Sequence, residues 1–199
     1  ARLEKKAYRV YCIMGDGEQQ EGQVWEAAME AGHYKLDNLC AIIDYNRLQI
    51  DGRVADVMCI DPLADKYRAF GFHVLSIDGH SMKELLEAFE QARRNKVKPT
   101  VIIARTVKGK GVPYMEGIAG WHGKAPAVEQ MKVAIEHLGL EGRIDVDGLL
   151  QRAAVHQSMV EERLVSNEPS FSRDFWWNRG PSMKVDMAPT RKGFGKALE

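Results

Sequence analysis

Two short segments of the sequence combine residue types suited to binding a divalent cation and a diphosphate. The tripeptide Gly-Asp-Gly at 15–17 directly follows an apolar run at 8–14, and Asn46 closely follows a second apolar run at 39–44. Ligands of α/β sheets bind where the parallel strands end, so we expect both segments at one sheet edge. Carboxylate, amide and main-chain oxygens are suitable Mg²⁺ ligands, and the ion then adds diphosphate oxygens and water. The tripeptide alone is typical of a tight turn; with Asn46 after the next strand it predicts a metal and diphosphate site.

The glycine pattern does not fit the two common nucleotide-binding motifs. A dinucleotide-binding G-x-G-x-x-G motif that starts at Gly15 would need its third glycine at Gln20. A P-loop near Gly123 would need a glycine at Ile118 and a serine or threonine at Ala125. The sequence therefore does not support a nicotinamide enzyme or a P-loop nucleotide enzyme.

Alternating strands and helices are predicted around these segments. Apolar runs indicate strands at 8–14, 39–44, 72–78 and 100–106, and the first of them is expected to be buried. Helices are predicted at 23–35, 62–70, 127–139 and 147–166, and another runs from Ser81, with Glu84 placed for a capping box, to Arg94. This alternation is typical of an α/β fold with a parallel sheet flanked by helices. The glycine-rich stretch that follows Thr106 is predicted to be a long functional loop.

The composition of the 199 residues excludes several classes of protein. Lys and Arg total 28 and Asp and Glu total 28, so the basic surplus of a nucleic-acid binder is missing. No apolar run is long enough for a membrane span, and the N-terminal residues lack the apolar core of a secretory signal. Cys12, Cys40 and Cys59 are widely spaced and indicate reduced thiols. We therefore expect a cytoplasmic protein without nucleic-acid or membrane partners.

The sequence from Gly15 to Gly52, GDGEQQEGQVWEAAMEAGHYKLDNLCAIIDYNRLQIDG, resembles the thiamine-diphosphate motif of transketolases. The resemblance continues through ARTVKGKGVPYMEG and GWHGKAP and resumes at PTRKGFGKAL. Related acetyl-transferring and dehydrogenase enzymes share the GDG…N pattern but usually lack LQIDG and the WHG loop. The resemblance implies a thiamine-diphosphate-binding fold and the reversible transfer of a two-carbon ketol unit from a ketose phosphate to an aldose phosphate in the pentose phosphate pathway.

The resemblance also assigns roles to individual residues. Asp16, Asn46 and the main-chain oxygen of Leu48 match the ligands of Mg²⁺, for which Ca²⁺ or Mn²⁺ would substitute. The residues implied to bind thiamine diphosphate are Gly15, Asp16, Gly17, Glu18, Asn46, Ile50 and His122. His122 matches a catalytic histidine near the reacting carbon, and Glu21 and Glu26 match catalytic acids that link two cofactors across a dimer interface.

Several residues have a simpler interpretation beside the functional one. Glu21 and Glu26 would otherwise be first-turn helix acids favoured by the helix dipole. Lys108 in the glycine-rich loop would contact a phosphate or remain a solvated charge. The other histidines, which are His33, His73, His80, His137 and His156, are expected to be structural or exposed.

The resemblance places the chain as an internal segment of a transketolase, incomplete at its N-terminus. Residues 1–166 match the latter part of the diphosphate-binding domain, 167–189 a linker, and 190–199 the start of the pyrimidine-binding domain. The segment would hold half of an active site that a homodimer, or missing segments of the same enzyme, completes. Two alternatives stay open: a non-catalytic transketolase-like fragment that binds a partner, and a related thiamine-diphosphate enzyme with another ketose donor.

Overall fold

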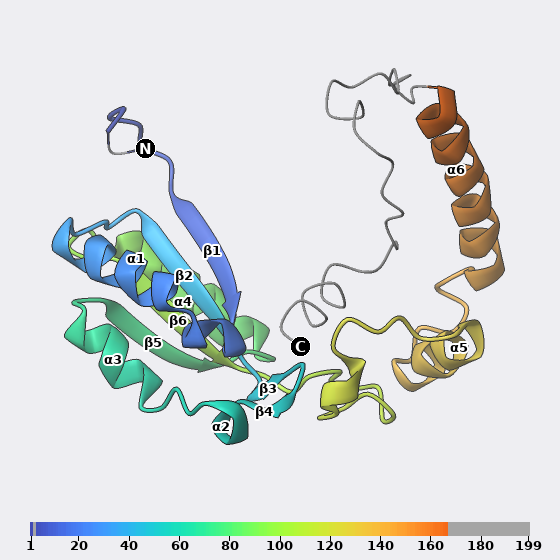
Figure 1. Ribbon diagram of the computed structural model, residues 1–199, viewed down its shortest axis with the longest axis horizontal. Helices are drawn as coiled ribbons and strands as arrows, with labels where there is room; N and C mark the ends of the chain where they lie inside the picture. Colours follow the sequence, from blue (N-terminus) through green and yellow to red (C-terminus); the bar gives the residue numbers. More distant parts are fainter. Residues whose placement is uncertain (2, 167–199) are drawn as a thin grey trace, which may run out of the picture. The chain divides into compact units, whose positions relative to one another are not determined.

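Four parallel strands form the central sheet of the protein, in the order β1-β2-β6-β5 (Figure 1). The computed structural model describes residues 1 and 3–166. The strands are β1 (Val10–Gly15), β2 (Leu39–Tyr45), β5 (His73–Asp78) and β6 (Thr100–Arg105). All four coincide with the strands predicted from the apolar runs, and with the helices that flank them they confirm the α/β fold class.

Helices cover both faces of this sheet. On one face, α1 (Gly22–His33) and α3 (Leu63–Ala69) share a buried core with alternate strand residues, among them Ile43, Val101 and Ile103. On the other face, α4 (Met82–Arg94) buries Ala88 and Ala92 against Cys40 and Ile102. Because β2 and β6 contribute to both cores, successive residues of each strand are apolar, as expected for a parallel sheet covered on both sides.

The prediction that the first strand is buried was wrong. β1 lies at the edge of the sheet and pairs only with β2 among the described residues. Tyr11 is 51% exposed and Ile13 is 75% exposed. Their side chains lie on the same face of the sheet as Cys40 and Ile42 of β2, which α4 covers. The buried core under α4 contains residues of β2, β6 and β5 but none of β1. Apolar composition alone does not distinguish a central strand from this edge strand.

Short elements that the sequence did not predict follow β2. β3 (Leu48–Gln49) and β4 (Gly52–Arg53) form an antiparallel hairpin, and α2 (Val54–Val57) continues from it. The long loop after β6 contains one short 3-10 helix, η2 (Ala119–Trp121), and leads into α5 (Val128–His137). The hairpin carries Leu48 and Ile50, two of the residues predicted to bind the metal and the cofactor.

The predicted capping box at the start of α4 is only half formed. The Ser81 hydroxyl accepts a hydrogen bond from the Glu84 backbone N–H at 3.3 Å, as expected. The Glu84 carboxylate, however, accepts from the backbone N–H of Asp78 at 2.8 Å instead of that of Ser81. Glu84 therefore ties the helix to the end of β5.

The chain divides into two compact units, Ala1–Ile144 and Asp145–Glu199. In the second unit the structure describes α6 (Val146–Ser166), which was predicted at 147–166. The predicted linker at 167–189 and the predicted second-domain start at 190–199 lie outside the described residues. Within the described part of the chain, no helix combines the length and the apolar character needed to cross a membrane.

Candidate active site

The carboxyl ends of β1 and β2 bring the two predicted metal-binding segments together. Gly15 ends β1 in register with Asp44 of β2, and the backbone N–H of Asp16 donates to the Asp44 carbonyl at 3.2 Å. Asp16 then caps the short helix η1 (Gly17–Gln20), because its carboxylate accepts from Gly17 N at 2.9 Å. The second carboxylate oxygen accepts from Arg47 N, between the predicted ligands Asn46 and Leu48. The predicted metal ligands therefore converge at one edge of the sheet.

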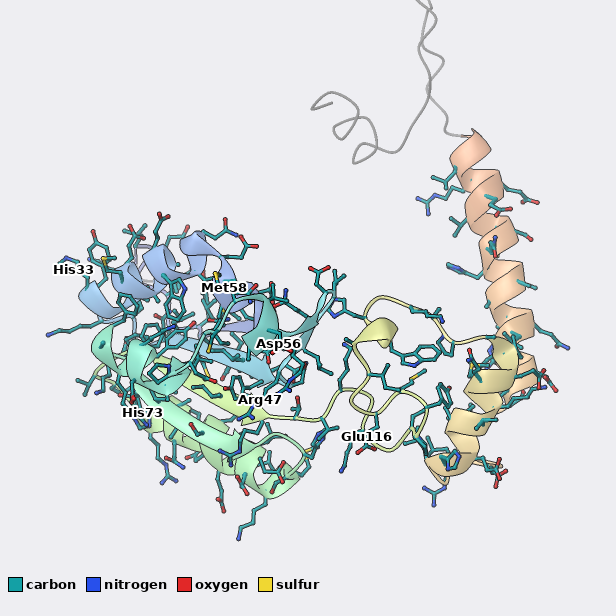
Figure 2. The ribbon with its side chains drawn as sticks, turned by 60° about the horizontal axis from the view of Figure 1, so that its bottom comes forward. His33, Arg47, Asp56, Met58, His73 and Glu116 are labelled. Atoms are coloured by element: carbon teal, nitrogen blue, oxygen red, sulfur yellow. The ribbon has the colours of Figure 1, made fainter. Side chains whose placement is uncertain are left out.

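Arg47 has a backbone conformation that suits this contact. Its φ is 65°, in the left-handed region that residues other than glycine seldom adopt. This conformation turns the chain between Asn46 and Leu48, so that the Arg47 N–H reaches Asp16. Figure 2 shows Arg47 at the end of the sheet nearest the loop that carries Glu116, whereas His33 and His73 lie toward the opposite end.

The Asp16 carboxylate is held where a negative charge is costly. It is 1% exposed, and burial raises its pKa above the ordinary 3.8, while the hydrogen bonds from Arg47 and Gly17 lower it and the charge of Asp44 raises it further. None of these influences is a cationic side chain. A buried carboxylate is normally paired with a cation or protonated. The site therefore suits a bound divalent cation.

Asp44 binds both Asp16, through its carbonyl, and Asn46, through its carboxylate. The sequence reasoning did not predict this role. One of its carboxylate oxygens accepts from the Asn46 amide at 3.1 Å, and the other accepts from the Thr106 hydroxyl. The Asn46 amide oxygen in turn accepts from Leu48 N at 2.8 Å. Asp44 thus orients Asn46 from behind, as carboxylates behind metal ligands commonly do. Its position two residues before Asn46, at a strand end, was the signal available in the sequence.

A buried polar network fixes the turn that carries Asp16. Gln19 is 1% exposed, and its side-chain amide donates to the Gly15 carbonyl at 3.1 Å. The Gln19 amide oxygen accepts from the Tyr67 hydroxyl of α3 at 2.7 Å, and its main-chain oxygen accepts from the Trp25 indole at 2.8 Å. These contacts join residues up to 48 positions apart, and the sequence reasoning missed them.

The residues present fit a cation and a diphosphate at this turn. A side chain at Gly17 would place its Cβ in a tight contact, 3.1 Å from the Gln49 Cβ, which glycine avoids. The Gln49 amide oxygen is buried without a hydrogen-bond partner among the described residues. The close glycine backbone suits a diphosphate, and the buried carboxylate and the unpaired amide oxygen suit a cation bound to it.

No group of three or more His, Cys, Asp and Glu residues suited to a metal ion occurs among residues 1 and 3–166. The predicted ligand set differs from such a group because it uses one carboxylate, one side-chain amide and one main-chain carbonyl. A set of this kind leaves several positions of an octahedral cation for diphosphate oxygens and water. The donor chemistry therefore favours Mg²⁺ bound together with an anion.

His122 lies in the loop that follows β6. It caps the end of η2, is exposed, and its Nδ1 lies 3.5 Å from the Lys108 Nζ. An ammonium group only donates, so Nδ1 faces it as an acceptor and the ring proton is assigned to Nε2. η2 contacts β4 of the hairpin, which brings this loop beside the segment that carries Leu48 and Ile50.

The remaining predicted residues lie on the surface of the same unit. Ile50 is 70% exposed at the tip of the β3–β4 hairpin. Glu18 folds back so that its carboxylate accepts from Gly15 N at 2.5 Å. Glu21 precedes α1 as its N-cap residue without a side-chain cap, and Glu26 is exposed on the second turn of α1. The simpler interpretation of both as first-turn acids was therefore wrong, because the first turn of α1 carries no acid.

Comparison with known proteins identifies the family. The sequence model of the family described as "Transketolase, thiamine diphosphate binding domain" matches residues 4–159. The chain belongs to the transketolase family. It is 46% identical over 138 residues to one subunit of the apulose-4-phosphate transketolase of Phocaeicola vulgatus, a match that covers 69% of this chain and 49% of that protein. It is 49% identical over 198 residues to the mouse transketolase, a match that covers 98% of this chain and 30% of that protein.

The fold agrees with solved transketolase structures. The transketolase of Campylobacter jejuni superimposes with a TM-score of 0.65 at 39% sequence identity, over 70% of this chain and 22% of that one. The transketolase resemblance seen in the sequence and the thiamine-diphosphate-binding fold are thereby confirmed. The chain spans about half the length of the Phocaeicola vulgatus relative and under a third of the mouse transketolase.

Proposed function

We propose that this chain carries the metal and diphosphate half of a transketolase active site. The observation that carries the proposal is the buried Asp16 carboxylate, which accepts from Arg47 N between Asn46 and Leu48 at the carboxyl edge of the sheet. Asp16, Asn46 and the Leu48 carbonyl would hold Mg²⁺, and Ca²⁺ or Mn²⁺ would replace it. Since this chain belongs to the family's thiamine diphosphate binding domain, the cofactor's diphosphate would supply the anionic ligands of the ion.

The proposed reaction is the transfer of a two-carbon ketol unit from a ketose phosphate to an aldose phosphate. Thiamine diphosphate, when bound, supplies the reactive carbon for this chemistry. The protein binds and orients: Gly15, Gly17 and Glu18 form the turn against the diphosphate, and the Ile50 side chain offers an apolar surface for the cofactor rings.

His122 is proposed to move a proton at the substrate. Its Nδ1 is directed at the Lys108 ammonium, so Nε2 carries the proton that the ring can donate to a sugar oxygen. We also propose that Lys108, whose Nζ lies 3.5 Å from the His122 Nδ1, contacts a phosphate and does not remain a solvated charge.

The rest of the active site is proposed to come from outside the described residues. The exposed Ile50 and the exposed acids Glu21 and Glu26 are the surfaces that a second domain would cover, with the acids linking two sites across a homodimer. Residues 1–166 are proposed as the latter part of the diphosphate-binding domain, 167–189 as a linker and 190–199 as the start of the pyrimidine-binding domain. Two arrangements of the complete enzyme agree with the relatives. The match to the mouse transketolase over 98% of this chain supports a single longer polypeptide. The Phocaeicola vulgatus relative is one subunit of its enzyme, which supports a separate partner subunit instead.

A second candidate is the same chemistry with a different ketose donor. The Phocaeicola vulgatus relative, 46% identical over 138 residues, is named for apulose 4-phosphate. The residues that hold metal and diphosphate do not choose the sugar, so this domain is compatible with either donor.

A coupled assay of the complete enzyme tests the proposal. The full chain, together with a partner subunit if one copurifies, is supplied with thiamine diphosphate, a ketose phosphate and an aldose phosphate. We expect ketol transfer that requires both Mg²⁺ and the cofactor, and a panel of donors identifies the sugar. Absence of transfer with every donor, from protein that binds the cofactor, would overturn the enzyme assignment in favour of a non-catalytic, partner-binding role.

A further inference from the structure

An open cavity of about 400 Å³, lined by both apolar and polar side chains, adjoins the candidate active site. Arg47, whose backbone N–H binds Asp16, directs its side chain to this cavity, and Arg105, Tyr45, Asp61 and Ser76 also line it. The cavity lies between the carboxyl half of the sheet and the start of α3. Its volume falls within the range of small-molecule pockets, about 300–1,000 Å³.

Regular secondary structure positions the polar groups of this cavity. Arg105 ends β6 in register with Tyr45 of β2, and the neighbouring Ser76 of β5 is in register with Ile103. The Arg47 guanidinium lies 5.3 Å from the centre of the Tyr45 ring, a cation–π contact that holds it over the end of β2. Tyr45, Ser76 and Arg105, on three adjacent strands, therefore face one cavity, and strands fix such groups more accurately than loops do.

The two guanidinium groups are not neutralised within the described part of the chain. Neither Arg47 nor Arg105 takes part in an ion pair there. Asp78, in register with Arg105, accepts instead from the His80 backbone N–H at 2.9 Å. Asp61 accepts from the Tyr45 hydroxyl at 2.6 Å.

The sum of these charges leaves the cavity cationic. Two guanidinium groups and one carboxylate give a net charge of one positive unit. Burial and the bond to Asp61 raise the pKa of Tyr45 to about 12, so its hydroxyl stays protonated at neutral pH. The Ser76 hydroxyl is a further donor at the wall.

We propose that Arg47 and Arg105 form a binding site for a phosphate monoester, separate from the metal and diphosphate turn. A phosphate monoester carries about −1.5 to −2 charge at pH 7 and three acceptor oxygens, enough for two guanidinium forks and a hydroxyl. A single carboxylate has two oxygens and one charge, and would leave one guanidinium unpaired beside Asp61. The volume beyond the phosphate group itself leaves space for the organic part of the ligand.

Two sources supply this chemistry. One is the phosphate of the sugar substrate, a version that rests on the proposed ketol transfer. The other is a separate phosphorylated metabolite, which would occupy the cavity whether or not the enzyme transfers a ketol unit. Both place a phosphate monoester on the same two arginines.

A binding experiment on the full chain tests the site directly. Inorganic phosphate is titrated calorimetrically at constant ionic strength, with EDTA present and without cofactor, so that no divalent ion can hold phosphate at Asp16. We expect Arg105→Gln to weaken phosphate binding by about tenfold or more, and Arg105→Lys by less, because lysine keeps the charge but loses the planar fork.

Arg53→Gln is the matched control, because Arg53 of β4 is exposed, as Arg105 is, but does not line the cavity. We expect its affinity for phosphate to stay within about twofold of wild type, as for a screened surface charge. Equal losses in both variants, or no phosphate binding by the wild type at millimolar concentration, would overturn the site. Circular dichroism verifies that each variant is folded.

Kinetics of the complete enzyme then separate the two sources. If Arg105→Gln raises KM for a phosphorylated donor but not for an unphosphorylated ketose, the ligand is the substrate phosphate. If both KM values are unchanged while phosphate binding is lost, the ligand is a separate phosphorylated metabolite. If KM rises equally for both donors and phosphate binding is retained, Arg105 supports the fold and the proposal is wrong. The calorimetric result stands even if ketol transfer is not observed.

Discussion

The two regions that make up the candidate site are held in different ways. The metal turn at 15–20 is attached to the core: Gln19 is buried and bonded to Tyr67 of α3, and Asp16 is buried and bonded to Arg47. The histidine loop at 107–127 is held largely by its own contacts, such as the bond from the Trp121 indole to the Tyr114 carbonyl at 2.7 Å.

This difference suggests a division of labour. The buried charge of the metal turn needs a rigid surrounding, because a low-dielectric site stabilises a cation only if its ligands are already in place. The exposed His122 side chain has one polar contact among the described residues, to Lys108, so we expect its position to adjust when substrate binds. We propose that the metal turn binds the cofactor and that the histidine loop moves the proton, and the following changes test that proposal in order of expected effect.

Asp16→Ala should have the largest effect. Removing the buried carboxylate takes away the one charged ligand, and we expect metal-dependent binding of thiamine diphosphate to fall at least about 100-fold. Calorimetry with and without Mg²⁺ measures this. Asp65→Ala removes an exposed carboxylate that pairs with Arg68 at 2.6 Å, and should leave cofactor binding unchanged. Unchanged affinity in Asp16→Ala would refute the metal site.

His122→Ala should separate the two regions most clearly. We expect turnover to fall about 100-fold or more, as for loss of a general acid or base, while cofactor affinity stays within about twofold. Steady-state kinetics at saturating cofactor and a cofactor titration give the two quantities. Equal turnover in wild type and variant would show that His122 has no catalytic role. A loss of cofactor affinity as large as the loss of turnover would show that the two regions do not have separate functions.

A matched pair of hydroxyl deletions compares the supports of the two regions. Tyr67→Phe leaves the buried Gln19 amide oxygen without its donor, which should lower the free energy of unfolding by about 1–3 kcal/mol and weaken cofactor binding several-fold. Tyr114→Phe deletes the bond to the Gln130 carbonyl of 2.6 Å at a partly exposed position. We expect a smaller stability loss there and no change in cofactor affinity.

Denaturant unfolding and cofactor titration of both tyrosine variants measure these effects. If Tyr114→Phe weakened cofactor binding as much as Tyr67→Phe, the two regions would not be independent. In a double variant, Tyr67→Phe with Gln19→Leu, the free energy of unfolding should fall by less than the sum of the falls in the two single variants. The reason is that each single change disrupts the same hydrogen bond.

The smallest effect is expected at His73, at the amino end of β5. Burial, with a smaller contribution from Lys98, lowers its pKa below 6.5, so the folded state disfavours the protonated ring. The stability that depends on the neutral ring is complete above pH 6.5 and is lost as pH falls through 6.5 toward the lower folded-state pKa. His73→Gln should reduce the fall in Tm between pH 7.5 and pH 5, measured by thermal unfolding.

The turnover profile provides the control for His73. His73 lies at the opposite end of the strands from Asp16, so His73→Gln should leave the pH dependence of turnover, measured well below Tm, unchanged. If His73→Gln shifted this profile, the loss of turnover at low pH would reflect the stability of the fold and not the titration of groups in the histidine loop.

Local patterns in the sequence were sufficient for the four strands of the central sheet, for the longer helices and for the glycine turn at 15–17 after β1. Apolar runs and helix-forming stretches depend on neighbouring residues, and so do the glycines that follow β1. The positions of Asp16 and Asn46 at strand ends follow from the same patterns. Parallel strands end at one edge of a sheet, so their convergence could be predicted without knowing the strand order.

The tertiary structure decided what surrounds these residues. β6 lies between β2 and β5, which brings Arg105 beside Tyr45 and forms the cavity with Arg47. The bond between Tyr67 and Gln19 joins residues 48 positions apart, and the exposure of β1 depends on how far α4 extends over the sheet. Such contacts depend on the packing of whole elements, which local sequence preferences do not specify. The sequence thus determined which residues are candidates for binding a metal, and the packing decided which of them are buried, oriented and supported.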